Sequence, residues 1–232
     1  MTSSRDAFLE RVRKAVTAGN RAGIVHALPE RNGVGYQGAG PDPLARFQNE
    51  WTQAGGQFHL LKSAGAACDK ILELIQAHDA RRILLGNDPV LGPLDLYQFL
   101  QGNGLEVISA DGSEPTINRD SFFAADIGIS GVDFLIAETG SLVMRASPHQ
   151  PRSISLLPPV HIAVAERRQL LPDLFDLFDK TSKFSKDVES LTFPLPSSMT
   201  LITGPSKTGD IELRLVTGVH GPGTVHVLML DS

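Results

Sequence analysis

The sequence predicts an α/β fold in which an open, mostly parallel sheet has helices on both faces and is preceded by a helical N-terminal extension. Two observations predict this class. Between residues 44 and 108, short apolar runs alternate with helical patterns of about ten residues, which is typical of parallel strands joined by right-handed crossovers. The final run, residues 225–230, is dominated by apolar residues, as expected for a strand near the centre of such a sheet.

The first 43 residues are expected to form an extension, and residues 44–232 a single α/β domain. A short amphipathic helix is predicted after the candidate caps Ser3 and Ser4. Its apolar residues recur at helical spacing: Phe8, Leu9, Val12, Ala15 and Val16. Residues 19–43 are rich in Gly, Pro and Asn, which predicts a long loop. The sequence leaves open whether the helix packs against the domain or grips a partner chain.

The first half of the domain is expected to contain alternating helices and strands. In chain order these are a helix over residues 44–54, a strand over 57–61, a helix over 66–78, a strand over 82–85, a helix over 94–100 and a strand over 105–108. Gly55 and Gly56 end the first helix, because glycine adopts the left-handed conformation found after helix ends.

From residue 125 onward the apolar runs follow one another too closely for helical crossovers. Part of this segment is therefore expected to pair antiparallel or to form a hairpin. Strands are expected over residues 126–130, 134–137, 142–145, 153–157 and 160–165, followed by a helix with Leu170, Leu171, Leu174, Leu177 and Phe178 on its apolar face. After a polar loop up to Pro196, we expect a strand over 200–203, a turn, a short helix that begins at Thr208 and continues around 211–215, and the last strand.

Composition restricts the functional classes. The formal net charge of -5 is spread without a block of like charges, which argues against nucleic acid or an anionic membrane as the main partner. No apolar run is long enough to span a bilayer and the N-terminus lacks an apolar signal core, so we expect a cytoplasmic protein. Cys68 is the only cysteine, which rules out an internal disulfide and a thiolate cage for an iron–sulfur cluster. The histidines show no metal-binding spacing, so we expect no metal and no cofactor.

The first candidate site follows the apolar run 134–137, where Glu138 precedes a tight turn formed by Thr139, Gly140 and Ser141. Open α/β sheets bind ligands beyond the carboxyl ends of their strands, so Glu138 is a candidate general base or carboxylate nucleophile. In the alternative interpretation, the Glu138 carboxylate accepts hydrogen bonds from the backbone of the Gly140 turn or pairs with Arg145.

The second candidate site is the turn after the strand over 200–203. If a helix begins at Thr208, a small anion could bind at its start, because the first N–H groups of a helix have no intrahelical partner. The anion would also meet the hydroxyls of Ser206 and Thr208 and the ammonium of Lys207, and Gly204 would allow close approach. A small carboxylate or phosphate fits this cradle. In the alternative interpretation, Ser206 or Thr208 is only a helix cap and Lys207 a solvated lysine.

His220 lies in a glycine-rich loop, residues 218–223, whose backbone can approach a ligand closely. It is a candidate acid–base group, although histidines in such loops are more often hydrogen-bonded scaffolding. Arg145 and His149 follow Glu138 along the chain, and their positions suggest that they line the same crevice.

Taken together, these segments resemble the lactate-utilisation protein C family, whose shared unit is called the LUD domain. The resemblance rests on residues 131–141, 202–212 and 218–222, with Lys207 in place of a commoner arginine and Gly209 in place of a commoner alanine. It implies a fold like that of the NagB, ribose-5-phosphate isomerase and CoA-transferase group. It also implies a role in oxidising L-lactate to pyruvate beside two companion proteins that carry iron–sulfur clusters.

Three functions follow as hypotheses. The first is an accessory component of L-lactate oxidation that acts with the iron–sulfur companions and holds no redox cofactor itself. The second is an independent enzyme acting on a small anionic metabolite, with acyl or CoA transfer through Glu138 and anion binding through Lys207 and the Gly204 turn. The third is a ligand-sensing or interaction module in which the glycine loops are structural.

Overall fold

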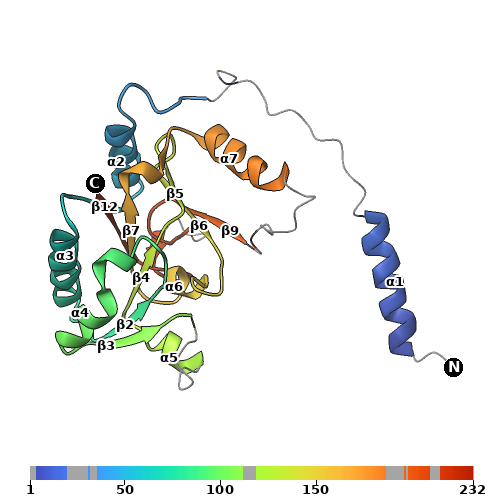
Figure 1. Cartoon of the computed structure of the whole chain (residues 1–232), viewed down its shortest axis with the longest axis horizontal. Coiled ribbons are helices and arrows are strands. Elements are labelled where there is room, and N and C mark those ends of the chain that lie inside the picture. The colour runs from blue at the N-terminus through green and yellow to red at the C-terminus, as the bar shows by residue number, and fades with distance from the viewer. Residues whose placement is uncertain are drawn as a thin grey trace. The chain divides into compact units, whose positions relative to one another are not determined.

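The computed structural model describes residues 4–19, 31, 36–111, 119–186, 196, 198–209 and 215–231. The chain divides into two units, Met1–Tyr36 and Gln37–Ser232. In the first unit, helix α1 (Ser4–Gly19) confirms the predicted N-terminal helix (Figure 1). Most of the predicted loop over 19–43 and of the polar loop before Pro196 lies outside the described residues.

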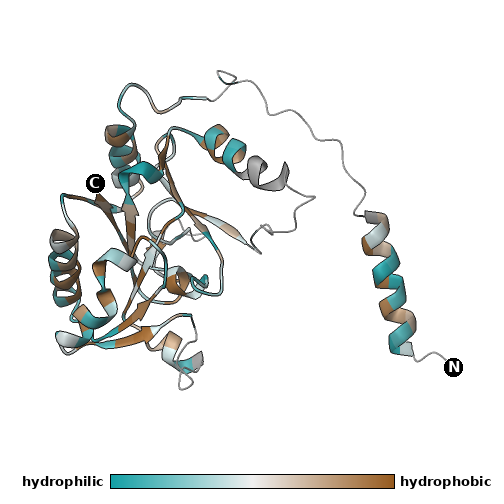
Figure 2. Cartoon of the chain, viewed as in Figure 1, coloured by the Kyte–Doolittle hydropathy of each residue, from teal (hydrophilic) through white to brown (hydrophobic). Residues whose placement is uncertain are grey.

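The second unit is built around a six-stranded parallel sheet in the order β1-β12-β7-β4-β2-β3. Its strands are β1 (Gln57–Leu61), β2 (Arg82–Leu85), β3 (Glu106–Ser109), β4 (Ile127–Gly131), β7 (Val160–Glu166) and β12 (Thr224–Leu230). The sheet confirms the predicted α/β class. Strand β12 lies between β1 and β7, as expected from its apolar residues, and Figure 2 shows hydrophobic residues concentrated along the strands.

Helices α3 (Ala64–Ala77) and α4 (Leu96–Gly102) cover one face of this sheet, together with the short 3₁₀ helix η1 (Gly92–Leu94). Helix α3 begins after Ser63, whose hydroxyl accepts a hydrogen bond from Ala66 N–H at 3.2 Å. Its buried residues, such as Ile71, pack on Ile83 and the other inward side chains of the parallel strands. Each fully buried aliphatic side chain contributes about 1.5–3 kcal/mol to this face.

The other face is covered partly by helices and partly by a second sheet, in the order β8-β5-β6-β9. Its strands are β5 (Phe134–Ile136), β6 (Ser141–Arg145), β8 (Leu170–Leu171) and β9 (Met199–Ile202). Helix α2 (Pro43–Gln53) packs beside this sheet through Phe47 and Trp51, and α7 (Leu174–Lys186) covers its outer side through Leu177. The antiparallel β5–β6 and β6–β9 pairs confirm the predicted change in pairing after residue 125.

Two short helices, α5 (Arg119–Phe123) and α6 (Ser153–Leu156), lie on the same face over the β3 side of the main sheet. The prediction of a strand over residues 153–157 is therefore wrong. Helix α6 packs its backbone directly on Gly128, where an added Cβ would lie 2.1 Å from the carbonyl oxygen of Ile154. Only a residue without Cβ leaves room for a helix at that position on the strand.

Two further predictions of local structure need correction. Leu170 and Leu171 belong to strand β8, and the helix begins only at Leu174, because Leu171 and its neighbour pair with β5. Residues Lys207–Gly209 form strand β10, which pairs antiparallel with β11 (Leu215–Thr217), so no helix begins at Thr208. The rest of the predicted helix, residues 210–214, lies outside the described residues.

Candidate functional site

The two segments singled out in the sequence meet in the structure. Strands β6 and β9 pair antiparallel, with Leu142 opposite Ile202. Just beyond this pair, Ser141 Oγ lies 2.7 Å from Thr203 Oγ1, and Thr139 Oγ1 lies 2.8 Å from Ser141 Oγ. A chain of three hydroxyl groups therefore joins the Glu138 turn to the Gly204 turn.

Both turns pack tightly against the end of helix α2. Gly140 has φ +60°, and a Cβ there would lie 2.5 Å from the backbone N of Trp51. Gly204 has φ +79°, and a Cβ there would lie 2.7 Å from the carbonyl oxygen of Ala54. Lys207 Nζ donates to that same carbonyl oxygen at 2.5 Å. A cation is favourable at this end of the helix dipole, so these contacts give Lys207 a capping role.

The Glu138 carboxylate also has backbone partners. Its Oε1 accepts hydrogen bonds from the N–H groups of Gln37 (2.9 Å) and Gly38 (3.0 Å), in the segment that leads into α2. The partners expected in the structural alternative were the Gly140 turn or Arg145, and Arg145 pairs with Asp133 instead. Glu138 follows β5 of the second sheet and so does not stand at the carboxyl edge of the parallel sheet. Its catalytic role stays a prediction.

The loop that contains His220 packs on the Ser206 turn. Ser206 N–H donates to the carbonyl of Pro222 at 2.9 Å, and Gly218 N–H donates to the carbonyl of Ser206 at 3.0 Å. Gly223 N–H donates to the carbonyl of Pro159, immediately before β7, which places this loop at the amino-terminal edge of the main sheet. His220 is exposed there, and Thr208 lies in β10 opposite Val216. The N–H groups of this segment are therefore not those of a helix start.

A pocket of ≈ 800 Å³ lies at the opposite, carboxyl edge of the sheet, next to strands β2 and β4. It is lined by Asp88, Asp133, Arg145, Ala146, Ser147, Pro148, Gln150, Pro151, Arg152 and Pro196. The chain passes from β2 outward to β3 and then returns past β2 to β4. Neighbouring strands whose connections run in opposite directions leave a crevice at their carboxyl ends, where open α/β proteins bind ligands. The pocket occupies this topological switch point.

Asp88 follows β2, and its carboxyl group packs against the backbone of β4 at Gly131. Its Oδ1 accepts a hydrogen bond from Val90 N–H at 2.9 Å, and a Cβ on Gly131 would lie 2.3 Å from the same oxygen. Gly131 therefore makes room for this carboxyl group. Burial raises the pKa of Asp88, and the carboxylates of Asp133 and Glu166 act in the same direction, whereas Val90 N–H and Arg145 oppose them. A carboxyl group with a raised pKa in a crevice is a candidate for proton exchange with a ligand.

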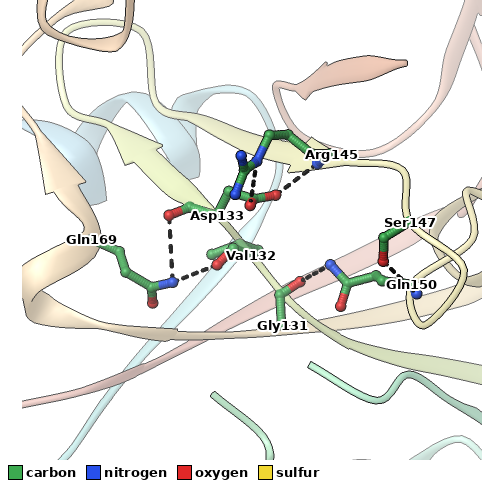
Figure 3. A network of polar contacts seen from close by, with 7 residues as sticks. All are labelled: Gly131, Val132, Asp133, Arg145, Ser147, Gln150 and Gln169. Carbon is green, nitrogen blue, oxygen red and sulfur yellow. Dashed lines mark hydrogen bonds and ion pairs between the residues drawn. The ribbon is translucent and has the colours of Figure 1, made fainter. Parts of the chain in front are cut away.

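A polar network surrounds Asp133, which follows β4 (Figure 3). Its two carboxylate oxygens accept hydrogen bonds from the backbone N–H and the Nε of Arg145, both at 2.7 Å. Gln169, in the 3₁₀ helix η2 (Arg167–Gln169), donates to the carbonyls of Val132 and Asp133. The Asp133 side chain is only 14% exposed, so the ion pair forms a fixed wall of the pocket.

The loop after β6 lines another part of the pocket. Gln150 is 4% exposed; its Nε2 donates to the carbonyl of Gly131 at 3.1 Å, and its backbone N–H donates to the Ser147 hydroxyl at 3.0 Å (Figure 3). Asn87 N–H donates to the carbonyl of His149 at 3.1 Å. The loop is thus tied to the ends of both β2 and β4, and it presents Arg152 at the pocket.

Sequence reasoning applied the strand-end rule only to Glu138. The same signal was present at two other positions, because Asp88 follows the apolar run 82–85 and Asp133 follows the run 126–130. Arg145 and His149 were expected to line a crevice near Glu138, but Arg145 lines the pocket with Asp88 and Asp133. Within the described ranges, no three His, Cys, Asp or Glu side chains are grouped as metal ligands, and no helix is long and apolar enough to cross a membrane.

The fold and this pocket define an open α/β domain with a pocket at the switch point of its parallel sheet. The LUD domain family matches residues 44–230, so the chain belongs to the LUD domain family. A crystal structure of a DUF162 family protein from Deinococcus radiodurans is similar with a TM-score of 0.57 and 19% identity, covering 82% of this chain and 96% of that chain. At this identity the likeness concerns the fold alone.

Two relatives carry the name lactate utilization protein C. The protein from Halalkalibacterium halodurans is 35% identical over 67% of this chain and 64% of its own length. The protein from Bacillus licheniformis is 30% identical over 93% of this chain and 98% of its own length. The match therefore spans less than two thirds of the first relative and nearly all of the second.

Proposed function

We propose that this chain takes part in lactate utilisation, as an accessory component of L-lactate oxidation to pyruvate that acts with iron–sulfur companion proteins. The observation that carries the proposal is the LUD domain match over residues 44–230 together with relatives named lactate utilization protein C, one of which aligns over 98% of its length. We propose that this role is performed in the cytoplasm.

The residues of the chain support an accessory role. Cys68 is the only cysteine, and an iron–sulfur cluster requires several thiolate ligands. Burial raises the pKa of the Cys68 thiol, and Asp69 adds to this effect, so the thiolate that binds metals is disfavoured. The electrons released from lactate would therefore pass to clusters in the companions.

Deleting the gene tests the role in lactate utilisation. In a host without another lactate oxidase, the deletion should abolish growth on L-lactate and leave growth on pyruvate unchanged. Complementation with the full chain should restore growth, and a Cys68→Ser variant should restore it equally if the thiol holds no cluster. Unimpaired growth of the deletion strain on L-lactate would count against the proposal.

Purification tests the companions separately. A tagged full chain from lactate-grown cells should carry co-purified proteins that contain iron and acid-labile sulfide, and glucose-grown cells should yield less. If lactate growth requires the chain but no iron–sulfur protein binds it, the partner part of the proposal is wrong.

The alternative of acyl transfer through Glu138 has less support in the structure. One carboxylate oxygen of Glu138 already binds two backbone N–H groups, and the Lys207 ammonium caps α2. Both charges of that proposed site thus have structural partners.

A further inference from the structure

We propose that the carboxyl-edge pocket binds a small monocarboxylate with a hydroxyl or oxo group beside its carboxylate. Arg152 would bind the carboxylate, and Asp88 would exchange a hydrogen bond with the neighbouring oxygen. The inference rests on the proposed function for its ligand class and adds a binding site, and its test measures binding alone.

The charges of the pocket favour a single negative charge on the ligand. Its lining contains two carboxyl groups and two guanidinium groups. The Asp133 carboxylate and the Arg145 guanidinium neutralise each other through the contact between Asp133 Oδ1 and Arg145 Nε at 2.7 Å. Arg152 is exposed, and within the described part of the chain its guanidinium makes one hydrogen bond, from Nη1 to the Ser198 hydroxyl at 3.4 Å. Arg152 and Asp88 remain outside this ion pair, so one guanidinium group is available to bind a carboxylate.

Asp88 adds both selectivity and a second contact. A phosphate dianion near Arg152 would also lie near the carboxyl groups of Asp88 and Asp133, whereas a monocarboxylate meets less repulsion. The raised pKa of Asp88 allows its carboxyl group to gain a proton and donate to an oxo group, or to remain ionised and accept from a hydroxyl. A ligand that has a carboxylate and a neighbouring hydroxyl or oxo group can therefore contact both Arg152 and Asp88.

Asp88 and the loop that carries Arg152 are held in place by neighbouring backbone, as expected for residues of a binding site. Asp88 is held by Val90 N–H and by its close approach to Gly131, and the loop that carries Arg152 is tied to β2 and β4 through His149 and Gln150. The pocket of ≈ 800 Å³ is much larger than a three-carbon acid. A ligand with few contacts is therefore expected to bind weakly, with a Kd on the order of 1 mM.

The experiment is a titration of the isotope-labelled full chain followed by NMR. The probes are L-lactate, pyruvate, propionate and inorganic phosphate, where propionate is lactate without its hydroxyl group. The variants are Arg152→Gln and Asp88→Asn. Their matched controls are Arg81→Gln, at the amino-terminal edge of the sheet, and Asp69→Asn, on α3. An unfolding curve for each variant establishes that it is folded.

The proposal expects L-lactate and pyruvate to bind the native chain more tightly than propionate and phosphate do. Arg152→Gln should weaken binding of every carboxylate by about tenfold or more, because a charge-assisted hydrogen bond is lost. Asp88→Asn should reduce the preference for L-lactate over propionate, and the two control variants should bind like the native chain. Because Arg152 is exposed, its variant keeps the test decisive even if Asp88→Asn unfolds.

Three results would overturn the inference: no carboxylate binding up to about fifty times the expected Kd, equal L-lactate binding by the native chain and Arg152→Gln, or tighter binding of phosphate than of L-lactate. A preference for L-lactate that survives in a folded Asp88→Asn variant would remove Asp88 from the site. Because this readout is binding alone, it is independent of the growth test for lactate utilisation.

Discussion

Substituting Gly140 by alanine tests whether the Glu138 turn is built to pack on helix α2. The backbone of Gly140 has φ +60°, and for an L-residue this left-handed conformation costs about 1–2 kcal/mol. The new Cβ would also lie 2.5 Å from the backbone N of Trp51 and 2.7 Å from the carbonyl carbon of Glu50. Because these are backbone atoms, the helix or the turn has to move, at about 1–3 kcal/mol.

The two contributions together predict a loss of about 2–5 kcal/mol in the free energy of unfolding, a large share of the roughly 5–15 kcal/mol typical of a domain. Gly104→Ala is the matched control, because Gly104 has φ +79° and open space within 4 Å of the Cβ that alanine would add. Gly104→Ala should lower the free energy of unfolding only by the cost of the left-handed conformation, about 1–2 kcal/mol. Urea denaturation followed by circular dichroism measures both variants.

The difference between Gly140→Ala and Gly104→Ala isolates the contact with α2. If the two variants lose the same free energy of unfolding, the close approach of the turn to the helix has no energetic consequence and the structural interpretation of this motif fails. A larger loss of free energy of unfolding for Gly140→Ala would show that Gly140 is needed for the turn to pack on α2.

The remaining predictions concern Glu138 and His161. A strain with Glu138→Gln should still grow on L-lactate, and the variant should lose less than about 1 kcal/mol in its free energy of unfolding, because an amide oxygen still accepts from Gln37 and Gly38. Glu138→Ala removes that acceptor and should lose about 1–3 kcal/mol. Loss of growth with a folded Glu138→Gln chain would instead support a catalytic role for Glu138. Burial lowers the pKa of His161, with His226 adding to the effect, to about 4. An unfolded chain with a His161 pKa of 6.5 then binds more protons than the folded chain between these values, so the free energy of unfolding should be highest above pH 6.5 and fall as the pH drops toward 4. At about 1.4 kcal/mol per pKa unit, His161 accounts for about 3 kcal/mol of this fall. A folded His161→Gln variant should therefore show a shallower dependence of the free energy of unfolding on pH. An unchanged slope would contradict the assignment of this fall to His161.

Local sequence patterns determined most of the helices and strands of the domain and where antiparallel pairing begins. The alternation of apolar runs and helical periodicity between residues 44 and 108 predicts elements that the structure contains, because periodicity reports which face of each element is buried. Close spacing after residue 125 also predicted antiparallel pairing correctly, since a short connection cannot contain a crossover helix.

Only the tertiary structure decided which sheet each strand joins, because strand partners lie far apart in the chain. Ile136 and Ala137 have the pattern of a buried strand end, yet β5 belongs to the second sheet, so Glu138 stands near α2. Asp88 and Asp133 have the same local signal and meet at the switch point because β2 and β4 are neighbours. Residues 153–156 form a helix that packs on Gly128, a contact that a local pattern does not report.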